Sequence, residues 1–483
     1  MNEVQLLIAG REVPASQGAT FERRHPVTGE VASRAAAATT ADAVAAAEAA
    51  QEAFPAWSGL GPSARRAVLL KAADLLEART GEVIERMVAE TGCTAPWAGF
   101  NAFLAAGMLR DAAGLTTQVG GEVIPSDRPS TLLFTMRQPV GVVLGIAPWN
   151  APIILGVRAV ASPLACGNTV VLKSSEICPA THRLIGEVMR DAGVPPGTLN
   201  VVSCSPADAP AVVQALIAHP AVRRVNFTGS SKTGRAVAEV AATHFKPVLL
   251  ELGGKAPVVV LDDADLDQAV AATAFSAFAN QGQICMSAER VVIDESLADA
   301  FVDRLATKAR SLPAGDPRQE GMVLGSLISP EAARRLAALV DDAVQKGARC
   351  VAGGPPKGTI MQATVLDHVT PEMRLYGEES FGPVVCVVRV RGVEEAIRIA
   401  NDTEYGLSSS VFGKDVTRAL AVARRIQASM CHVNGPTVHD EAQMPFGGMK
   451  ASGHGRFGGR AALDEFTELR TITVATGPLA YPF

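Results

Sequence analysis

The chain has 483 residues, of which 48% are hydrophobic, 19% charged and 5% aromatic. A chain of this length predicts roughly two to four domains with large buried cores. Its 44 Lys and Arg residues against 49 Asp and Glu residues give a net charge of −5, which excludes the basic surface typical of proteins that bind nucleic acids or membrane surfaces. Eight cysteines without a C-x-x-C or zinc-like spacing favour reduced thiols in a cytoplasmic protein.

Two segments are candidates for membrane targeting. The N-terminal MNEVQLLIAGREV has too short an apolar run for a signal peptide. Residues 139–157 carry no charge, which is typical of a membrane-spanning helix. Three prolines and three glycines interrupt this stretch, so we expect a buried strand, a tight loop and the start of a helix instead.

The first quarter of the chain has a mainly helical pattern. Apolar residues recur at helical spacing over 68–76, behind Pro62 and Ser63, which are expected to cap that helix. A long amphipathic helix is expected from about Trp97 to Leu115. A turn-rich connection then leads into the strand-like run TLLFTMRQPVGVVLGIAP.

After residue 140, apolar runs of strand length alternate with helical segments. NTVVLKSS, TLNVVS, VRRVNFTGS, KPVLLELGG and APVVVLDDAD are typical of buried strands, and helices are expected near 180–192, near 207–218 and from Thr233. This alternation predicts βαβ units and a wound parallel sheet, hence an α/β fold.

A second alternating series follows Asp267. It includes SPEAARRLAALVDDAVQKG, a predicted helix with Ser329 at its N-cap, Pro330 in its first turn and Gly347 at its end. The last residues, ELRTITVATGPLAYPF, predict a strand and a tail.

Three polar residues stand where catalytic groups are often found, although each has an ordinary alternative. Cys285 lies between an apolar helical pattern and a strand, where a small buried side chain is the alternative. Glu251 ends a hydrophobic strand in LLELGGKAP, where a solvated loop carboxylate is the alternative. Asn150 follows Trp149 and could cap the helix that begins near Pro152.

Taken in order, the motifs around these residues resemble the aldehyde dehydrogenase superfamily, specifically its hydrolytic, NAD(P)-dependent members. The motifs are PWNAP, KSSE, FTGSSKTG, ELGGK, GQIC, EESFGP and PFGGMKASGHGR, spread over essentially the whole chain. The resemblance implies a Rossmann-like NAD-binding domain (1–118 and 141–251), an α/β catalytic domain (252–450) and a small β oligomerisation element (119–140 and 467–483). A homodimer or homotetramer is expected from the same resemblance.

The resemblance also assigns chemical roles. Cys285 would attack the aldehyde carbon as a thiolate. The side-chain amide of Asn150 and the backbone N–H of Cys285 would stabilise the resulting oxyanion. Glu251 would act as general base for the water that hydrolyses the thioester.

For the cofactor, the resemblance implies binding through residues from both halves of the chain. These are Trp149, Lys173, Glu176, Gly229, Ser230, Gly234, Glu379 and Phe381. FTGSSKTG is neither a G-x-G-x-x-G nor a Walker A motif, and without the family context an ordinary strand-to-helix turn is an equal interpretation. Because a carboxylate at Glu176 accepts ribose hydroxyl bonds and repels a 2′-phosphate, NAD is expected rather than NADP.

Three positions depart from common family patterns. Ala151 replaces a frequent aromatic residue, which should open the substrate channel, and Phe457 replaces a second Glu. Arg158 interrupts the apolar segment APIILGVRAV, and positions 150, 154 and 158 are expected to share one helical face. Arg158 would then bond a polar group of the substrate, although a salt-bridged Arg is the equally weighted alternative.

Within the superfamily the chain is similar to bacterial benzaldehyde, vanillin and salicylaldehyde dehydrogenases. An aromatic aldehyde is therefore the expected substrate, with salicylaldehyde preferred, and Trp97, Ile284 and Met286 are expected to line its pocket. Phe103 and Met108 are further candidates for that lining.

Other interpretations rank lower. A CoA-acylating semialdehyde dehydrogenase, a catalytically silent homologue and a cofactor-independent cysteine hydrolase are each disfavoured by the joint presence of Cys285, Glu251 and Asn150 or by the absence of a His near the cysteine. The group His432, His439, Asp440 and Glu441 fits no usual ligand spacing, so no metal site is expected there.

Overall fold

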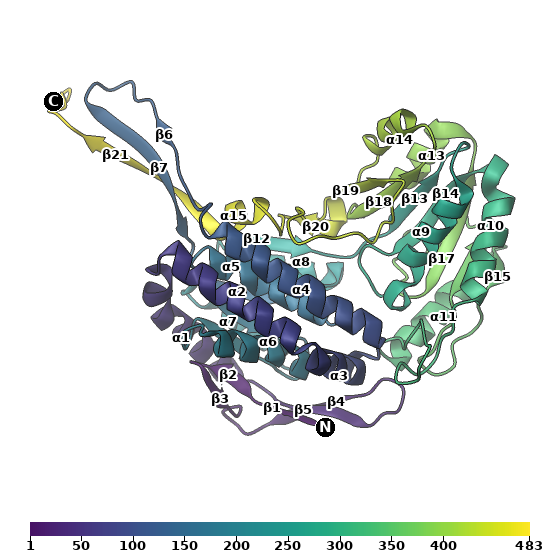
Figure 1. The fold of residues 1–483 in the computed structure, drawn as a ribbon, viewed down its shortest axis with the longest axis horizontal. Helices are drawn as coiled ribbons and strands as arrows, with labels where there is room; N and C mark the ends of the chain where they lie inside the picture. The colour runs from purple at the N-terminus through teal and green to yellow at the C-terminus, as the bar shows by residue number, and fades with distance from the viewer.

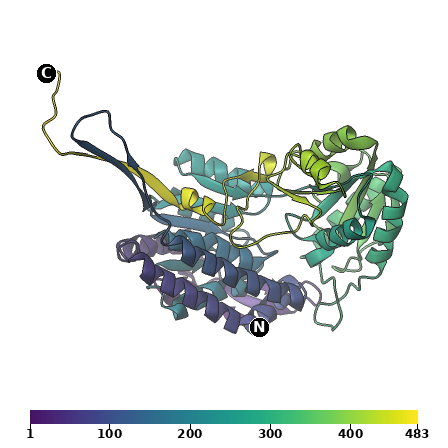
Figure 2. The ribbon, with the colours of Figure 1, turned by 45° about the horizontal axis from the view of Figure 1, so that its top comes forward.

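The structure, a computed structural model, describes residues 1–483. Two α/β lobes lie side by side, and a long β-arm that carries the C-terminus projects from the first lobe (Figure 1). A second view shows the same arrangement, with the arm standing clear of both lobes (Figure 2). None of the helices combines the length and the apolar character that a membrane crossing requires.

The first lobe is built on an eight-stranded sheet with the order β20-β12-β11-β8-β9-β10-β2-β3. Its strands are β2 (Leu6–Ile8), β3 (Arg11–Val13), β8 (Val142–Ile146), β9 (Thr169–Lys173), β10 (Leu199–Val202), β11 (Val222–Thr228), β12 (Val248–Glu251) and β20 (Gly453–His454). The five central strands pair in parallel, as their uninterrupted apolar runs predict. The chain winds outward in opposite directions from the neighbouring strands β8 and β11, and parallel α/β sheets bind ligands beyond such a switch point.

Helices cover both faces of this sheet. They are α1 (Thr40–Ser58), α2 (Pro62–Ala78), α3 (Thr80–Thr91), α4 (Ala95–Leu115), α5 (Pro152–Ala165), α6 (Pro179–Ala192), α7 (Ala209–Ala218), α8 (Ser231–Thr243) and α15 (Ala461–Phe466). One apolar core joins α2, α4, α5 and α6 to the sheet, and another joins α1, α7 and α8 to its opposite face. The uncharged stretch is therefore a buried strand, a loop and a buried helix, as predicted.

The N-terminal segment differs from the prediction. Instead of helices, it begins with five short strands that end at Ala36, and three of them, β1 (Asn2–Val4), β5 (Val31–Ala36) and β4 (Thr20–Arg24), form a separate small sheet. These strands are three to six residues long and partly exposed, so they leave no sustained apolar period in the sequence. The cap of α2 also differs, because Gly61 is the N-cap and Pro62 is the first helical residue.

The second lobe contains a seven-stranded sheet with the order β15-β16-β17-β14-β13-β18-β19. Its strands are β13 (Ala256–Val260), β14 (Ala288–Asp294), β15 (Arg349–Ala352), β16 (Thr364–Asp367), β17 (Val384–Val390), β18 (Ser408–Phe412) and β19 (Met430–Val433). Its helices are α9 (Leu266–Phe278), α10 (Glu295–Arg310), α11 (Pro330–Gln345), α12 (Arg374–Gly377), α13 (Gly392–Asn401) and α14 (Val416–Ala423), with short 3₁₀ turns at Ala279–Gly282 and Lys450–Ser452. Ser329 caps α11 as predicted, because its side chain accepts the Ala332 N–H at 3.2 Å.

The arm is a three-stranded antiparallel sheet made from two distant parts of the chain. Strand β7 (Thr131–Pro139) pairs with β6 (Val123–Ile124) on one side and with β21 (Thr467–Ala475) on the other. This pairing explains why a turn-rich segment and the C-terminus are both needed to form it.

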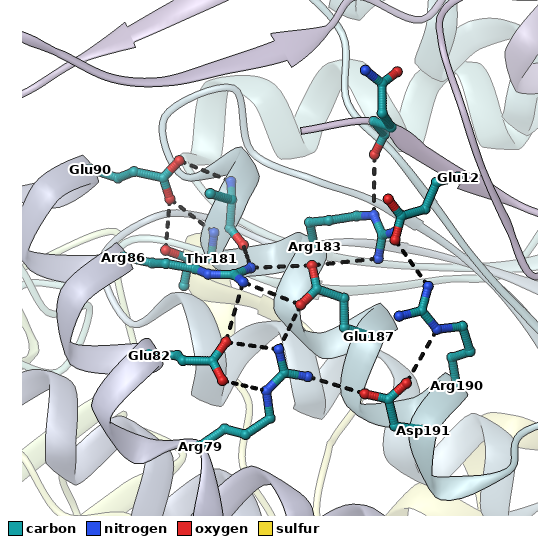
Figure 3. Close-up of polar contacts among 12 residues, drawn as sticks. Glu12, Arg79, Glu82, Arg86, Glu90, Thr181, Arg183, Glu187, Arg190 and Asp191 are labelled. Carbon is teal, nitrogen blue, oxygen red and sulfur yellow. Dashed lines mark hydrogen bonds and ion pairs between the residues drawn. The ribbon is translucent and has the colours of Figure 1, made fainter. Parts of the chain in front are cut away.

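Helix α6 is held by buried and surface charges together (Figure 3). The buried carboxylate of Glu90 accepts the N–H groups of Ala180 and Thr181 at 2.9 Å each, and the hydroxyls of Thr181 and Ser33 at 2.7 and 2.6 Å. Further out, ion pairs link this helix to its neighbours through Glu12, Arg79, Glu82, Arg86, Arg183, Glu187, Arg190 and Asp191.

The anchored helix in turn positions the loops around β9 and α5. The ring of His182 accepts the Ser175 N–H at 3.0 Å and lies 3.1 Å from the Pro152 carbonyl oxygen, to which it donates when neutral. Burial lowers the pKa of His182 to about 3, so the ring is neutral. The KSSE loop and the start of α5 are thus tied together at one end of the sheet.

Candidate active site

The three proposed catalytic residues come from both lobes and meet where the lobes face one another. Asn150 follows β8, Glu251 ends β12, and Cys285 lies between α9 and β14. A Cβ atom at Gly254 would lie 2.3 Å from the carbonyl oxygen of Cys285. Only glycine therefore allows the ELGGK loop to run against the cysteine, which brings the end of β12 beside it.

The segment that leads to Cys285 is held in an unusual conformation. Asn280 and Gln281 have φ angles of 48° and 54°, and Gly282 follows at 66°. The Asn280 amide donates to the Asn150 carbonyl at 3.0 Å, and the side chains of Gln281 and Gln283 both donate to the Ser326 carbonyl. A left-handed turn fixed in this way by hydrogen bonds is typical of functional sites.

Asn150 is also fixed on both sides. Its carbonyl accepts a further hydrogen bond from the Trp97 indole at 3.0 Å, and its side-chain amide donates to the Gln283 carbonyl at 3.0 Å. It does not cap α5, since Ala151 occupies the N-cap without a side-chain bond. The expectation that Asn150 shares a helical face with Arg158 is therefore wrong in detail, because the helix begins only at Pro152.

Two hydrogen-bond donors remain available beside the thiol. The Asn150 amide has a second N–H, and the backbone N–H of Cys285 donates to no other group of the chain. Asn150 and Cys285 line the same cavity, where a carbonyl oxygen would gain negative charge after attack by the thiolate.

Glu251 is buried, so the alternative of a solvated loop carboxylate is wrong. The residue is 1% exposed and its Oε1 has no hydrogen-bond partner. Burial raises the pKa of Glu251 to about 7, and the nearby Arg158 opposes this shift. Burial and the neighbouring Glu251 carboxylate also raise the pKa of the Cys285 thiol. A carboxyl group that titrates near neutrality beside a thiol is suited to proton transfer.

A cavity of about 660 Å³ opens onto Cys285 and Asn150. Its wall is mostly apolar, and it includes Trp97, Phe100, Leu104, Ala151, Ile154, Leu155, Phe275, Phe278, Ile284, Met286, Val438 and Phe446. Trp97, Ile284 and Met286 therefore lie where the sequence prediction placed them. Phe103 is 68% exposed on α4 and Met108 lies outside the wall, so these two further candidates are wrong.

Arg158 lines this cavity as half of a buried ion pair. Its Nη2 donates to Oδ2 of Asp440, and both side chains are less than a tenth exposed. The guanidinium carbon lies 4.1 Å from the centre of the Phe446 ring and 5.9 Å from that of Phe457. The paired alternative for Arg158 is thus realised, and it occurs within the cavity wall.

The partner of Arg158 was not identified from the sequence. The sequence places Asp440 only beside His432, His439 and Glu441, and these residues have different neighbours in the structure. His439 Nε2 lies 3.1 Å from Glu441, and the His432 and His439 rings stack at 5.1 Å. The pairing of Asp440 joins residues 282 positions apart, so no local pattern could reveal it.

The residues expected to hold the cofactor come from both lobes. Lys173 ends β9, and its ammonium group lies 2.9 Å from the Glu176 carboxylate. Burial would raise the pKa of Glu176, but the attraction of Lys173 outweighs it and the pKa is lowered. Ser230 caps α8, which begins at Ser231 and therefore two residues before the predicted start.

The glycines of FTGSSKTG lie close against neighbouring side chains. A Cβ at Gly234 would lie 2.4 Å from the Leu252 side chain, and one at Gly229 would lie 2.6 Å from the Phe227 ring. The N-terminus of α8 consequently sits tight against the sheet with the N–H groups of Ser231 and Lys232 free to meet an anion, as a dinucleotide pyrophosphate requires.

The EESFGP segment lies beside the ELGGK loop. The Glu379 carboxylate accepts the Gly254 N–H at 2.8 Å, and burial raises the pKa of Glu379 to about 8. Phe381 has a φ angle of 49°, and its ring meets that of Trp149 edge-on at 5.7 Å. Glu289, which the sequence prediction missed, fixes the segment by accepting the N–H of Phe381 at 3.0 Å.

An open groove of about 1050 Å³ lies beside the EESFGP segment. It is lined by polar residues of both lobes, including Ser230, Ser231, Lys232, Glu378, Glu379, Thr403 and Tyr405. Of the residues expected to hold the cofactor, Ser230 and Glu379 line this groove.

Comparison with known proteins identifies the family. The model of the aldehyde dehydrogenase family matches residues 13–472. The chain belongs to this family. It is 61% identical over 482 residues to a vanillin dehydrogenase of Pseudomonas fluorescens and 50% identical over 482 residues to a salicylaldehyde dehydrogenase of Pseudomonas putida, with 100% of each chain covered in both comparisons.

The fold is matched equally closely. A salicylaldehyde dehydrogenase from Pseudomonas putida G7, solved in complex with salicylaldehyde, superimposes with a TM-score of 0.99 at 50% identity and full coverage of both chains. The predicted family and the aldehyde dehydrogenase fold are therefore confirmed. The relatives support oxidation of aromatic aldehydes with a nicotinamide cofactor as the activity class, without singling out one aldehyde.

Proposed function

We propose that this aldehyde dehydrogenase oxidises a ring-hydroxylated benzaldehyde to its carboxylate with NAD. The observation that carries the proposal is that Cys285 and Asn150 line an apolar cavity of about 660 Å³, with the buried carboxyl group of Glu251 beside Cys285. Vanillin is the first substrate to test, because the vanillin dehydrogenase relative is 61% identical, and salicylaldehyde, the preference drawn from the sequence, is the second. Benzaldehyde and an aliphatic semialdehyde are the alternatives.

The chemistry begins at Cys285. The thiol loses its proton, for which the buried Glu251 carboxylate is an acceptor of suitable pKa, and the thiolate adds to the aldehyde carbon to give a thiohemiacetal. The Asn150 amide and the Cys285 N–H stabilise its oxyanion, and loss of one such donor costs about 3 kcal/mol. Bound NAD supplies the hydride acceptor, and a thioester on Cys285 remains.

Hydrolysis completes the cycle. Glu251 removes a proton from water, which attacks the thioester carbon and releases the carboxylate product and the Cys285 thiolate. A base buried next to the thioester favours water over the thiol of CoA as the attacking group. This argues for a hydrolytic enzyme rather than a CoA-acylating one.

The cofactor would be held by residues of both lobes, of which Ser230 and Glu379 line the groove. Lys173 and Glu176 would bind the adenosine ribose, and Gly229, Ser230 and Gly234 would place the pyrophosphate at the N-terminus of α8. Trp149, Glu379 and Phe381 would position the nicotinamide ribose and ring. The segments 1–118 and 141–251 would thus form the NAD-binding domain and 252–450 the catalytic domain, while the arm, 119–140 with 467–483, would join protomers into a homodimer or homotetramer.

A direct assay tests this proposal. NADH formation is followed by its absorbance with vanillin, salicylaldehyde or benzaldehyde in the absence of CoA, and the acid product is identified. The wild type is expected to form acid and NADH in equal amounts, and Cys285→Ser is expected to lose at least about 1000-fold in kcat because a hydroxyl is a far weaker nucleophile. Cys431→Ser, at a half-buried cysteine outside the cavity, is the control. Full activity of Cys285→Ser, or a strict need for CoA, would refute the mechanism.

A further inference from the structure

The wall of the cavity contains an ion pair that is separate from the catalytic groups and affects the choice of substrate. Arg158 and Asp440 form an ion pair within an otherwise apolar wall, with side chains 6% and 8% exposed. The pair therefore sits in a region of low dielectric, where charges act strongly on whatever enters. Lys308 also lines the cavity, but it is exposed on α10, where water screens its charge.

Each member of the pair keeps unused hydrogen-bonding capacity. Nη2 makes the only hydrogen bond of Arg158, so its other N–H groups are free. Oδ2 of Asp440 receives that bond, whereas Oδ1 has no partner. The Phe446 ring, 4.1 Å beneath the guanidinium, restricts the plane in which the free N–H groups can lie.

This arrangement differs chemically from an unpaired arginine. A free guanidinium in an apolar cavity binds carboxylates strongly. Beside Asp440, the net charge of the pair is zero and an incoming anion meets a carboxylate as well as a guanidinium. A hydroxyl group, in contrast, can accept from Arg158 and donate to Asp440 at once, which an ether oxygen cannot do.

We propose that Asp440 is a specificity-determining residue, which neutralises Arg158 so that the cavity accepts neutral rings bearing a hydroxyl group and rejects aldehydes that carry a carboxylate. The inference rests on the proposed aldehyde oxidation and defines its substrate class. Glu251, the other buried carboxylate near Cys285, adds to the rejection of anions but is the same in every variant considered below.

The test compares hydroxy-, methoxy- and carboxybenzaldehydes, each as the 2-, 3- and 4-isomer, with benzaldehyde at about pH 7, where the carboxyl group is ionised. In the wild type, at least one hydroxy isomer should exceed its methoxy counterpart in kcat/KM by about 10-fold or more, and every carboxy isomer should fall below benzaldehyde by at least about 10-fold. Asp440→Asn keeps the shape of the side chain but removes its charge. The ratio of carboxybenzaldehyde to benzaldehyde in kcat/KM should then rise by about 10-fold or more for at least one isomer, a gain that misfolding cannot produce.

The matched control is Glu441→Gln, which removes the charge of the adjacent carboxylate, an exposed group outside the cavity. Its ratios should equal those of the wild type. The proposal is overturned if the wild type oxidises any carboxybenzaldehyde as efficiently as benzaldehyde, or if Asp440→Asn leaves all carboxy ratios within about twofold of the wild type.

A second variant keeps the proposal testable if Asp440→Asn does not fold. Replacing the whole pair by Arg158→Met with Asp440→Leu removes both charges and fills the space with apolar groups, a change that buried ion pairs often tolerate. Loss of the hydroxy-over-methoxy preference supports the proposal, and retention of that preference contradicts it. If the wild type oxidises none of the hydroxybenzaldehydes, the proposed function fails; if they are oxidised but the ratios do not respond, only the role of Asp440 fails.

Discussion

At the scale of single residues, the chemistry of this protein depends on where ordinary side chains are placed. Glu251 is a carboxyl group with an ordinary pKa of about 4.3 in water, and burial raises that pKa to about 7. The shift places its titration in the pH range where thioester hydrolysis would occur. A general base works only in its deprotonated form, so the raised pKa limits the rate on the acid side.

Glu251→Gln is therefore expected to separate the two halves of the reaction. A burst of NADH, of at most one per active site, should be followed by turnover reduced about 100- to 10,000-fold. Removing the Glu251 charge removes one cause of the raised pKa of Cys285, so the thiol can still lose its proton to water, whereas hydrolysis lacks its base. In the wild type, steady-state kcat should fall as pH decreases through about 7, and the variant should lose this dependence. Stopped-flow absorbance across pH 5.5–8.5, a span of about three pH units around that pKa, measures both effects. Unchanged turnover in the variant would contradict the assigned role.

Glu176 decides between the two nicotinamide cofactors in the proposed mechanism. Its carboxylate lies 2.9 Å from the Lys173 ammonium, and its lowered pKa keeps it charged at neutral pH. Glu176→Gln removes the repulsion of a 2′-phosphate, so the NADP-to-NAD ratio of kcat/KM should rise by about 10-fold. Glu239→Gln, on the exposed face of α8, is the control and should leave the ratio unchanged. A wild type that already prefers NADP would show that Glu176 does not have this role.

The motifs predict which residues form the catalytic group, but they do not predict the surroundings of those residues. Cys285, Asn150 and Glu251 lie together as the motif order predicts, but nothing in LLELGGKAP indicates that Glu251 would be 1% exposed. Asp440 shows the limit more plainly. Asp440 and Arg158 are 282 positions apart and meet only because the second lobe packs against the first, so no local spacing predicts their ion pair.

At the scale of elements, predictions succeeded where a strong period or a cap was present. Helix α11 was anticipated from Ser329 and Pro330, and the parallel strands of the first lobe from their continuous apolar runs. The N-terminal strands failed because three-residue edge segments such as β2 and β3 depend on pairing with distant partners, including β10. The sequence also does not predict the role of Glu90, because its hydrogen-bond partners are Ser33 of β5 and the start of α6.

The buried end of α6 makes a prediction about stability. Glu90→Gln should lower the free energy of unfolding by about 2–4 kcal/mol, because the amide nitrogen would face donors that now meet a carboxylate oxygen. Arg190→Gln, in the exposed ion pairs of the same helix, should cost less than about 1 kcal/mol. Thermal unfolding followed by circular dichroism compares the two variants. Equal losses would mean that the surface network, and not the buried carboxylate, anchors the helix.

At the scale of the whole molecule, the catalytic residues come together because the two lobes of one chain face each other. The arm has no part in this site, and its sequence is instead marked by apolar residues with no covering layer. The register of β7 with β6 and β21 places Val123, Leu132, Phe134, Met136, Ile472 and Val474 on one face. Val123 is 76% exposed, and an apolar face of this kind on a projecting sheet is typical of a contact between subunits.

We therefore expect the arm to hold the oligomer together, and paired substitutions can test this without disrupting the sheet. Leu132 and Val474 lie directly opposite each other, so Leu132→Lys with Val474→Glu keeps a favourable cross-strand pair while it makes the face polar. The double variant should elute as a monomer of 50.1 kDa in light scattering, whereas the wild type should have a multiple of that mass. Thr473→Glu, on the opposite face of the same strand, is the control and should keep the wild-type mass. Cys285, Glu251 and Asn150 all lie in the lobes of one chain, so the monomer should keep its catalytic site. A double variant that remains an oligomer would place the subunit contact elsewhere.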